Sequence, residues 1–476
     1  MKKAKYRWSL LAGCLGALLV IRGWWTSQAA RAQADSDQVQ VVQAKIQAQG
    51  YEFGPAVNKI VLQVSQPVTA VARGEQLEVT TQGKGRQVSA LYLADEQGQA
   101  LPEGQASQWL ALDLVVDSWD LGSLFGYNQE RLISQWQASY LITVGPVQVT
   151  TQEGKSAQVH LADYDALPHL ELPDLAGYQF EQVHVDGVTN PLTGQEESQT
   201  LHYGAFEPAA AKDQTQAKFP LLIWLHGQAE GGEDPRIALL GNEVTALSRP
   251  QVQEIFTATD QPELKGAYVL AVQTPTYWMD EGDGLNGPGA GHSRYTESLM
   301  QVIGDYVTSH PQIDPHRVHL MGCSNGGYMT LNMALHYPDY FAGLVPQATA
   351  YSYYEFQRLD NGHYLIKDTK KRGSIQTYVP TQKVLDQDKV VALKDQAIWF
   401  VHSLDDPTVP ANAYVLPIYK DLVDAGGQNI WLSLFQSVQG QDLPKMRYSG
   451  HFSWIPFFNQ QVQGVQDPEV IRQSPG

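Results

Sequence analysis

A series of short apolar runs in the second half of the chain constrains its fold more than any other feature. The first run, at 220–225, is continuously apolar, as expected of a strand buried on both faces of a sheet. Similar runs follow at 267–272, 317–321, 398–401 and 430–435. Segments with apolar residues at helical spacing lie between them, at 296–307, 328–335 and 412–425. Strands that alternate with helices predict a mostly parallel sheet, so this half is expected to be an α/β domain.

The first half has a different pattern. Between about residues 36 and 170, short alternating runs recur at roughly 8- to 12-residue spacing, punctuated by Gly, Pro, Asn and Asp. The runs lie at 39–46, 56–64, 76–81, 87–93, 109–116, 138–144 and 148–151. This spacing predicts an all-β sandwich at 35–172, acting as a structural or binding module. Residues 171–216 show no regular period and are expected to be a junction, which places the α/β domain at 173–476.

Composition excludes several classes of protein. The chain has 476 residues, with 32 Lys+Arg against 50 Asp+Glu, and a formal net charge of −18. Nucleic acid is not expected as a main partner, because binding to phosphates requires a basic surface. The two cysteines are Cys14 and Cys323. A mature chain that has lost its N-terminus would keep only Cys323 and could form no internal disulfide.

Residues 1–34 have the pattern of a secretory signal peptide. Lysines and an arginine are followed by an apolar stretch at 8–21, and Ala32 and Ala34 provide the small residues of a cleavage site. The apolar stretch is shorter than the roughly 20 residues of a membrane span. Secretion of the mature chain is therefore expected.

Two other interpretations of this N-terminus stay open. Arg22 could end an uncleaved signal anchor. The segment 11–14 also matches a lipoprotein box, which would place a lipid on Cys14, although the apolar region before it would then be short. Membrane attachment is expected only in these two cases.

A G-x-S-x-G motif lies between the predicted strand at 317–321 and a predicted helix at 326–335. Its residues are Gly322, Cys323, Ser324, Asn325 and Gly326. The strand–turn–helix setting is that of a nucleophile elbow, in which the serine stands on a tight turn and glycines let the helix approach. The helix N-terminus then directs free N–H groups toward developing negative charge. Ser324 is accordingly the predicted nucleophile.

A serine nucleophile needs a base and an acid, and in this arrangement they follow it in the order Asp, His. Asp405 and Asp406 follow the strand at 398–401, where a parallel sheet places its site residues. Asp406 is preferred because it begins a D-x-x-V-P pattern in which Val409 and Pro410 are expected to start the next helix. Asp405 is expected to be a turn residue. His451 comes after the last strand and is the expected base.

The oxyanion donors are expected at the ends of two strands. The backbone N–H of Asn325 is one, and the N–H of Gln228, or alternatively of Gly227, is the other.

Trp278 and Tyr277, after the strand at 267–272, and Trp454 beside His451 are expected to line the substrate pocket. The acidic loop at 280–283 lacks the spacing of a calcium loop and is expected to be solvated. No His/Cys cluster indicates zinc, and no metal or cofactor is expected. Residues 350–395, rich in tyrosine at their start, could form a cap over the pocket.

Several motifs together resemble one known family. They are 225–227 (Leu-His-Gly), 322–327, 406–410 (Asp-Pro-Thr-Val-Pro) and 450–454 (Gly-His-Phe-Ser-Trp), with a weaker match at 51–57. The chain resembles the secreted bacterial α/β-hydrolase esterases with an N-terminal immunoglobulin-like domain, the EstA type, whose catalytic domain is similar to that of prolyl oligopeptidases. The resemblance implies an immunoglobulin-like front sandwich, an α/β-hydrolase domain, and a triad of Ser324, Asp406 and His451. Two pairs depart from the family pattern, His402-Ser403 and Gln228-Ala229.

The predicted function is hydrolysis of carboxylic esters, on short-chain or, by analogy with the family, carbohydrate-linked substrates. Ser324 would form an acyl-enzyme, and no cofactor would be required. A serine peptidase using the same residues is the alternative, although about 140 residues of sandwich cannot form the propeller of the large peptidases. A surface-binding protein with an inactive hydrolase core is the third and least favoured interpretation.

Overall fold

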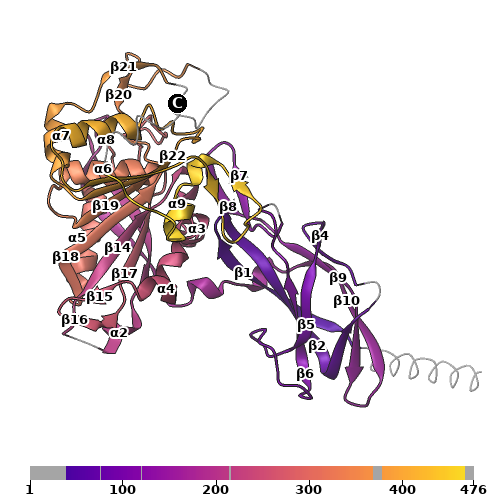
Figure 1. The fold of residues 1–476 in the computed structure, drawn as a ribbon. Helices are drawn as coiled ribbons and strands as arrows, with labels where there is room; N and C mark the ends of the chain where they lie inside the picture. Colours follow the sequence, from indigo (N-terminus) through magenta and orange to yellow (C-terminus); the bar gives the residue numbers. More distant parts are fainter. Residues whose placement is uncertain (1–38, 75–76, 120, 214–215, 368–377, 467–476) are drawn as a thin grey trace, which may run out of the picture. The chain divides into compact units, whose positions relative to one another are not determined.

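The computed structural model describes residues 39–74, 77–119, 121–213, 216–367 and 378–466 (Figure 1). The predicted signal peptide at 1–34, including Cys14 and Arg22, lies outside this part of the chain. The chain divides into two compact units. One consists of the described residues of Met1–Ala48, Val57–Val116 and Ala138–Glu171, and the other of Gln49–Ala56, Asp117–Gln137 and the described residues of Leu172–Gly476. The second unit thus includes two segments that sequence analysis assigned to the front sandwich.

The first unit is built from β-strands. Its nine-stranded sheet, counted over the described residues, contains β1 (Val41–Tyr51), β2 (Gly54–Arg73), β3 (Val79–Thr81), β4 (Lys84–Arg86), β5 (Val88–Ala94), β6 (Ser107–Leu114), β9 (Leu141–Thr151), β10 (Ser156–Asp165) and β11 (Leu170–Glu171). The pairing of β1 with β11 is parallel, whereas β2 pairs antiparallel with β6 and β9. Apolar residues such as Ile60, Leu62, Leu110 and Leu112 are fully buried and form the core. The immunoglobulin-like character of this unit stays a prediction.

The second unit contains the predicted, mostly parallel sheet. Within the described part of this unit the sheet has eight strands, in the order β12 (Tyr178–Thr189), β13 (Glu196–Phe206), β17 (Tyr268–Gln273), β14 (Phe219–Leu225), β18 (Ile313–Cys323), β19 (Gly343–Gln347), β22 (Ile398–Ser403) and β23 (Ile430–Phe435). The pairs from β17 through β23 are parallel, and β13 is antiparallel to both of its neighbours. The apolar runs of the sequence therefore form the centre of this sheet.

The expectation of a junction at 171–216 is wrong for most of that segment. It forms β12 and β13, a long antiparallel hairpin at the edge of the sheet that turns at Asn190, whose side chain accepts hydrogen bonds from the N–H groups of Leu192 and Thr193. β12 is the edge strand of the sheet and pairs with β13, and most of its residues are exposed, so it contains no long apolar run. The sequence pattern therefore did not reveal a strand there.

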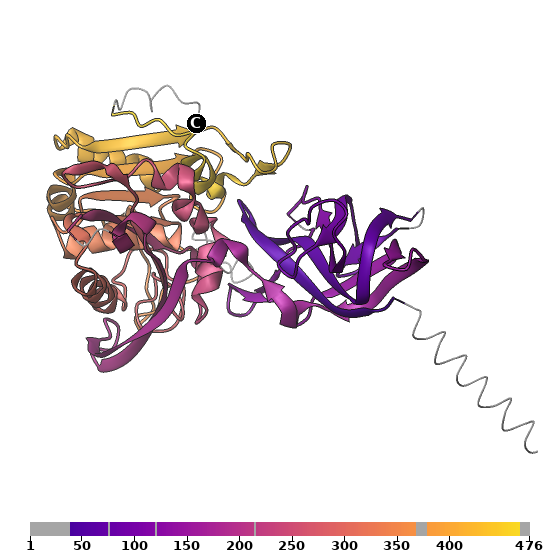
Figure 2. The same cartoon turned by 90° about the horizontal axis from the view of Figure 1, so that it is seen from below.

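Helices cover both faces of this sheet (Figure 1, Figure 2). Along β14, Leu221 and Ile223 belong to the same core cluster as α5 (Thr296–Ser309), α6 (Asn325–His336), α7 (Gln387–Lys394) and α8 (Val415–Asp424). Leu222 and Trp224 belong to the core of the opposite face, with α3 (Pro235–Gly241), α4 (Pro250–Gln253) and α9 (Trp454–Phe458). This alternation explains why β14 is wholly apolar, because each face contacts a helix layer.

Shorter elements complete the second unit. They are the hairpin of β7 (Phe125–Asn128) and β8 (Ile133–Trp136), then α2 (Ala209–Asp213), β15 (Thr257–Ala258), β16 (Gln261–Lys265), β20 (Tyr354–Phe356), β21 (Pro380–Lys383), β24 (Val438–Gln439) and β25 (Arg447–Tyr448). No helix within the described ranges is both long and apolar enough to cross a membrane.

Candidate active site

Ser324 stands on the turn between β18 and α6, as the motif predicted. Its backbone adopts φ 54° and ψ −109°, a left-handed conformation that costs a residue with a side chain about 1–3 kcal/mol. The Ser324 N–H donates to the carbonyl of Gln347 on β19 at 2.8 Å, and this bond fixes the turn against the sheet. The local geometry is therefore that of a strained elbow at the carboxyl end of a central strand.

The two glycines of the motif are required by close backbone contacts. A Cβ at Gly326 would lie 2.0 Å from the carbonyl oxygen of Leu225, at the end of β14. A Cβ at Gly322 would lie 2.7 Å from the same oxygen. Any larger residue at either position would push α6 away from β14, and with it the helix N-terminus that follows Ser324.

His451 and Asp406 form a hydrogen-bonded pair near this elbow. The Nδ1 of His451, in a 3₁₀ turn at Gly450–Phe452, lies 2.9 Å from Oδ2 of Asp406. The other oxygen of Asp406, Oδ1, accepts from the N–H groups of Thr408 and Val409 at 2.8 and 2.9 Å. One carboxylate oxygen is thus held by the backbone and the other is directed at the imidazole.

Asp406 is buried, yet it remains ionised. Burial by itself would raise the pKa of Asp406, but the attraction and hydrogen bond of His451, together with the Val409 N–H, outweigh it and lower this pKa. Asp405 is directed elsewhere, because its carboxylate accepts from Ser403 Oγ at 2.6 Å and from Arg447 at 3.0 Å. The structure therefore brings Asp406, and not Asp405, to His451.

The loop after β14 is held by a buried histidine. His226 is fully buried, and burial lowers its pKa to about 4, so it is neutral at pH 7. Its Nε2 accepts from the N–H of Thr274 at 3.1 Å, which places the proton on Nδ1, and Nδ1 donates to the Gly227 carbonyl at 2.6 Å. This bond fixes the orientation of the peptide between Gly227 and Gln228, where one oxyanion N–H was predicted.

A network of side-chain hydrogen bonds links Gln228 and Asn325, the two predicted oxyanion residues. Its central member is Asn286, which was not predicted from the sequence. The Nδ2 of Asn286 donates to Gln228 Oε1 at 2.6 Å, and its Oδ1 accepts from Asn325 Nδ2 at 2.5 Å. Asn325 Oδ1 in turn accepts from the N–H of Met279 at 3.0 Å. One amide therefore connects the loop after β14 to the start of α6. A single asparagine in a long loop carries no sequence signal that could have identified it.

Ser324 and His451 face the same cavity, whose volume is about 480 Å³. Its other lining residues are Phe53, Pro55, Trp119, Ser123, Phe125, Gly126, Tyr127, Ser134, Gly227, Gln228, Ala229, Glu230, Gly241, Asn242, Cys323, Thr408, Phe452 and Trp454. Trp454 therefore lines the same cavity as Ser324 and His451. The lining residues between Phe53 and Ser134 were not predicted to line this cavity. Nothing in the sequence of an all-β stretch indicates which of its loops will pack beside a serine about 200 residues later in the chain.

The prediction that Trp278 and Tyr277 line the pocket is wrong. Trp278 is fully buried among core residues, beside His226 and Tyr295, because it points into the helix layer. Tyr277 donates its hydroxyl to the carbonyl of Arg131, at the turn of the β7–β8 hairpin. Its role is therefore to hold that hairpin.

Further bonds attach the hairpin to the catalytic loops. Trp136 Nε1 donates to Asp234 Oδ2 at 2.8 Å, and Asp234 also caps α3 by accepting from the Arg236 N–H. The Arg236 guanidinium lies over the Trp136 ring, 5.4 Å from its centre. The hairpin is therefore anchored on the same segment that follows the predicted oxyanion loop.

Glu230 is a buried carboxyl within the loop that follows β14. It is 7% exposed, and a Cβ at Gly227 or Gly241 would approach its side chain to 2.9 or 2.5 Å. Burial raises the pKa of Glu230 to about 7, although a hydrogen bond with Asn242 and the attraction of His451 oppose this rise. The folded chain therefore holds this proton over a pH range in which an unfolded chain releases it.

Glu230→Gln is expected to remove a pH-dependent loss of stability. Since the pKa of Glu230 rises from 4.5 to about 7 on folding, the free energy of unfolding of the wild type decreases as pH increases through this window, by about 2–3 kcal/mol between pH 5 and pH 8. Below pH 4.5 Glu230 is protonated in both the folded and the unfolded chain, and it no longer affects the free energy of unfolding. Denaturant unfolding of the wild type and of Glu230→Gln at pH 5 and pH 8 measures this decrease. The same pH dependence in both proteins would contradict a raised pKa for Glu230.

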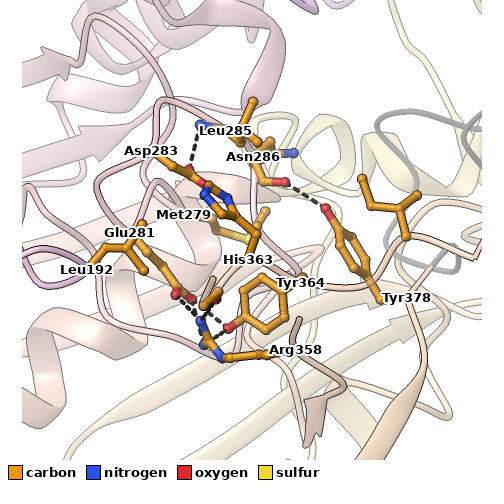
Figure 3. A pocket seen from close by; sticks show the side chains of 13 residues that line it. Leu192, Met279, Glu281, Asp283, Leu285, Asn286, Arg358, His363, Tyr364 and Tyr378 are labelled. Carbon is orange, nitrogen blue, oxygen red and sulfur yellow. Dashed lines mark hydrogen bonds and ion pairs between the residues drawn. The ribbon is translucent and has the colours of Figure 1, made fainter. Parts of the chain in front are cut away.

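The described parts of 350–395 line a different cavity, of about 40 Å³ (Figure 3). Its polar side chains contact one another, since Arg358 bonds Glu281 at 2.8 Å and His363 Nδ1 lies 2.7 Å from Asp283 Oδ2. No residue of 350–367 or 378–395 lines the Ser324 cavity. The expectation of a solvated acidic loop at 280–283 is wrong for Asp280, which is fully buried and accepts from two backbone N–H groups, whereas Asp283 is exposed. Among the described residues, no group of three or more His, Cys, Asp or Glu side chains could hold a metal ion.

Comparisons with known proteins give a family match over part of the chain and a likeness of fold. Residues 296–436, which include Ser324 and Asp406, match the prolyl oligopeptidase family. A segment of 71 residues is 39% identical to poly(3-hydroxyalkanoate) depolymerase C of Paucimonas lemoignei, and the alignment covers 15% of this chain and 16% of that enzyme. A solved thermostable esterase has a TM-score of 0.62 at 18% identity, with 91% of this chain and 98% of that chain covered.

These findings confirm two predictions. The second unit has the α/β-hydrolase fold, as the likeness to the solved esterase shows. The prolyl oligopeptidase match over the elbow and the acid loop, together with the depolymerase segment, supports the predicted serine hydrolase. The chain spans a small part of the depolymerase, and the esterase comparison concerns the fold alone.

Proposed function

We propose that this protein is a secreted carboxylic-ester hydrolase that acts through Ser324, Asp406 and His451. The observation that carries the proposal is the hydrogen bond between His451 and the buried Asp406, together with a cavity that His451 shares with a serine on a strained elbow. Short-chain or carbohydrate-linked esters are the proposed substrates. Secretion rests on the N-terminal pattern of residues 1–34.

In the proposed mechanism, Ser324 Oγ attacks the ester carbonyl and His451 takes its proton on Nε2. Asp406 stays ionised, holds the proton of His451 on Nδ1 and stabilises the imidazolium that forms. The tetrahedral intermediate expels the alcohol, which takes the proton from His451 and leaves an acyl-enzyme. Water, deprotonated by His451, then attacks the acyl group. The resulting intermediate breaks its bond to Ser324 Oγ, which takes the proton back from His451, and the acid is released.

The oxyanion of each intermediate is proposed to accept from the backbone N–H groups of Asn325 and Gln228, with Gly227 as the alternative for the second. Asn325 is the first residue of α6, where N–H groups have no partner within the helix. The His226–Gly227 bond and the Asn286 bridge hold both loops before the reaction begins. Donors fixed in advance in this way stabilise developing charge without reorganisation.

Asn286→Ala is expected to lower kcat by about 10- to 100-fold with a smaller change in KM, because the two donors lose their alignment while the pocket walls remain. Steady-state rates with one p-nitrophenyl ester measure both constants. Asn429→Ala is the matched control, since Asn429 is exposed and its carbonyl accepts only from a strand N–H among the bonds described. If kcat is the same in both variants, Asn286 does not position the donors.

A serine peptidase is the second candidate, and the prolyl oligopeptidase match favours it. An ester and an anilide of the same acyl group distinguish the two, because both need the same triad but the amide bond is far less reactive. We expect Ser324-dependent hydrolysis of the p-nitrophenyl ester by the chain beginning at Asp35, and little or no hydrolysis of the p-nitroanilide. Cleavage of the anilide at a comparable rate would favour the peptidase.

A further inference from the structure

The cavity around Ser324 is lined by aromatic rings from segments that precede the catalytic sheet. Phe53, Trp119, Phe125 and Tyr127 come from Gln49–Ala56 and Asp117–Gln137, and Phe452 and Trp454 flank His451. Figure 1 shows β7 and β8 close to α9, which carries Trp454. One wall of the cavity is therefore not part of the α/β sheet or its helices.

Some of these rings have an evident role in packing. Phe125 lies edge-on to Trp136 with ring centres 5.0 Å apart, and Phe452 lies 4.7 Å from Trp454. Both pairs belong to the core on this face of the sheet. Such contacts account for Phe125 and Phe452 without any ligand.

Tyr127 and Trp119 are different, because much of their surface is left uncovered. Tyr127 is 46% exposed and Trp119 is 60% exposed, although both line the concave site. Large apolar side chains left open in a concavity mark a contact surface for a ligand, whereas scattered ones on a convex surface need no explanation.

The position of Tyr127 connects this surface to the reactive centre. It is on β7, which pairs with β8. Tyr277 bonds the turn of this hairpin at Arg131, and Asp234 bonds Trp136 at the end of β8. The Tyr127 side chain also interacts with Gln228, one of the proposed oxyanion residues. The hairpin is therefore attached to the oxyanion loop, and a ring stacked on Tyr127 would occupy the same cavity as an ester bound at Ser324.

We propose that the β7–β8 hairpin and Trp119 form an aromatic wall that selects esters carrying a flat aromatic ring over alkyl esters of similar size. This inference rests on the proposed function and names the substrate class of the same site. Aromatic rings bind to one another in offset or edge-on arrangements, and the preference exceeds what their buried area alone gives. The ring can belong to the acid or to the alcohol, and the experiment separates these cases.

The test uses two matched pairs of esters. Methyl 3-phenylpropanoate and methyl nonanoate have the same number of acid carbons and differ only in the kind of acid. Benzyl acetate and heptyl acetate have the same number of alcohol carbons and differ only in the kind of alcohol. The ratio of kcat/KM for the aromatic member to that for the alkyl member is measured by titration of the released acid. For the wild type we expect a ratio of about 10 or more in at least one pair. Ratios of one or less in both pairs overturn the proposal.

Variants at one position separate the ring from its hydroxyl and from bulk. Tyr127→Leu keeps an apolar side chain but removes the ring, and it should lower the ratio by about 3- to 10-fold. Tyr127→Phe keeps the ring and should preserve the ratio. Phe180→Leu removes an exposed ring on β12, outside the cavity, and should also preserve it. An unchanged ratio in Tyr127→Leu overturns the proposal.

Binding measurements keep this inference separate from the proposed function. Calorimetry with the Ser324→Ala protein compares the affinities of the two methyl esters and of the two acetates, with and without Tyr127→Leu. If the aromatic ester binds more tightly than the alkyl ester and Tyr127→Leu removes this difference, the aromatic wall is supported. This holds even if the wild type hydrolyses no ester, a result that would overturn the proposed function alone. Ser324-dependent hydrolysis without any aromatic preference supports the proposed function and overturns the aromatic wall.

Discussion

Ser324→Ala is expected to lower kcat for ester substrates by about 10³-fold or more, toward the roughly 10⁶-fold loss that removal of a serine nucleophile can cause. The hydroxyl is the only group of the residue that the mechanism uses, and alanine fits the same turn. Steady-state rates with p-nitrophenyl esters measure the loss. Some acceleration over water should persist, because the oxyanion donors and the pocket remain.

The neighbouring thiol provides the control for this variant. Cys323 also lines the cavity but is buried, and burial raises the pKa of its thiol, which makes it a poor nucleophile. Cys323→Ala should therefore keep most of the activity. If Cys323→Ala lost its activity and Ser324→Ala kept it, the nucleophile would be Cys323 and the proposed role of Ser324 would be wrong.

Asp406→Asn is expected to lower kcat by about 10²- to 10⁴-fold, although the substitution is almost isosteric. In the wild type, Oδ1 accepts from two backbone N–H groups, so the oxygen of an asparagine would occupy that position. Its NH₂ group would then face His451 Nδ1 and donate to it. The proton of the imidazole would move to Nε2, where it blocks transfer from Ser324 Oγ.

Asp405→Asn is the matched control, because it changes the adjacent residue in the same way. Asp405 bonds Ser403 and Arg447 and makes no contact with His451 among the bonds described, so kcat should change by less than about threefold. Steady-state rates and thermal unfolding of both variants separate catalytic effects from loss of folding. Equal losses of kcat in the two variants would rule out the proposed role of Asp406.

The parts of the site that sequence analysis predicted are those encoded by short local motifs. A strand, a tight turn and a helix within 317–335 define the elbow, and the chain order of this fold then limits the partners of Ser324 to residues after it. The preference for Asp406 over Asp405 rested on the residues that follow it. The structure explains this preference, since the N–H groups of Thr408 and Val409 hold one of its oxygens.

The parts that could not be predicted depend on contacts between distant segments. The β7–β8 hairpin belongs by sequence to an all-β stretch, and its place at the cavity depends on bonds to Tyr277 and Asp234. Asn286 has its role only because Gln228 and Asn325 lie on either side of it. The prediction that Trp278 lines the pocket was wrong, because a position just after a strand does not determine the direction of a side chain, and Trp278 is buried in the core.

Covalent labelling of the folded protein tests the central claim most directly. A fluorophosphonate reacts with a serine only where a base activates it and donors stabilise the resulting oxyanion, so it reports the whole arrangement. Intact-mass measurement of the chain beginning at Asp35, followed by peptide mapping, should show one adduct per molecule, located on Ser324, with a strongly reduced labelling rate in Asp406→Asn. Absence of labelling at Ser324, or an adduct on another residue, would contradict the account.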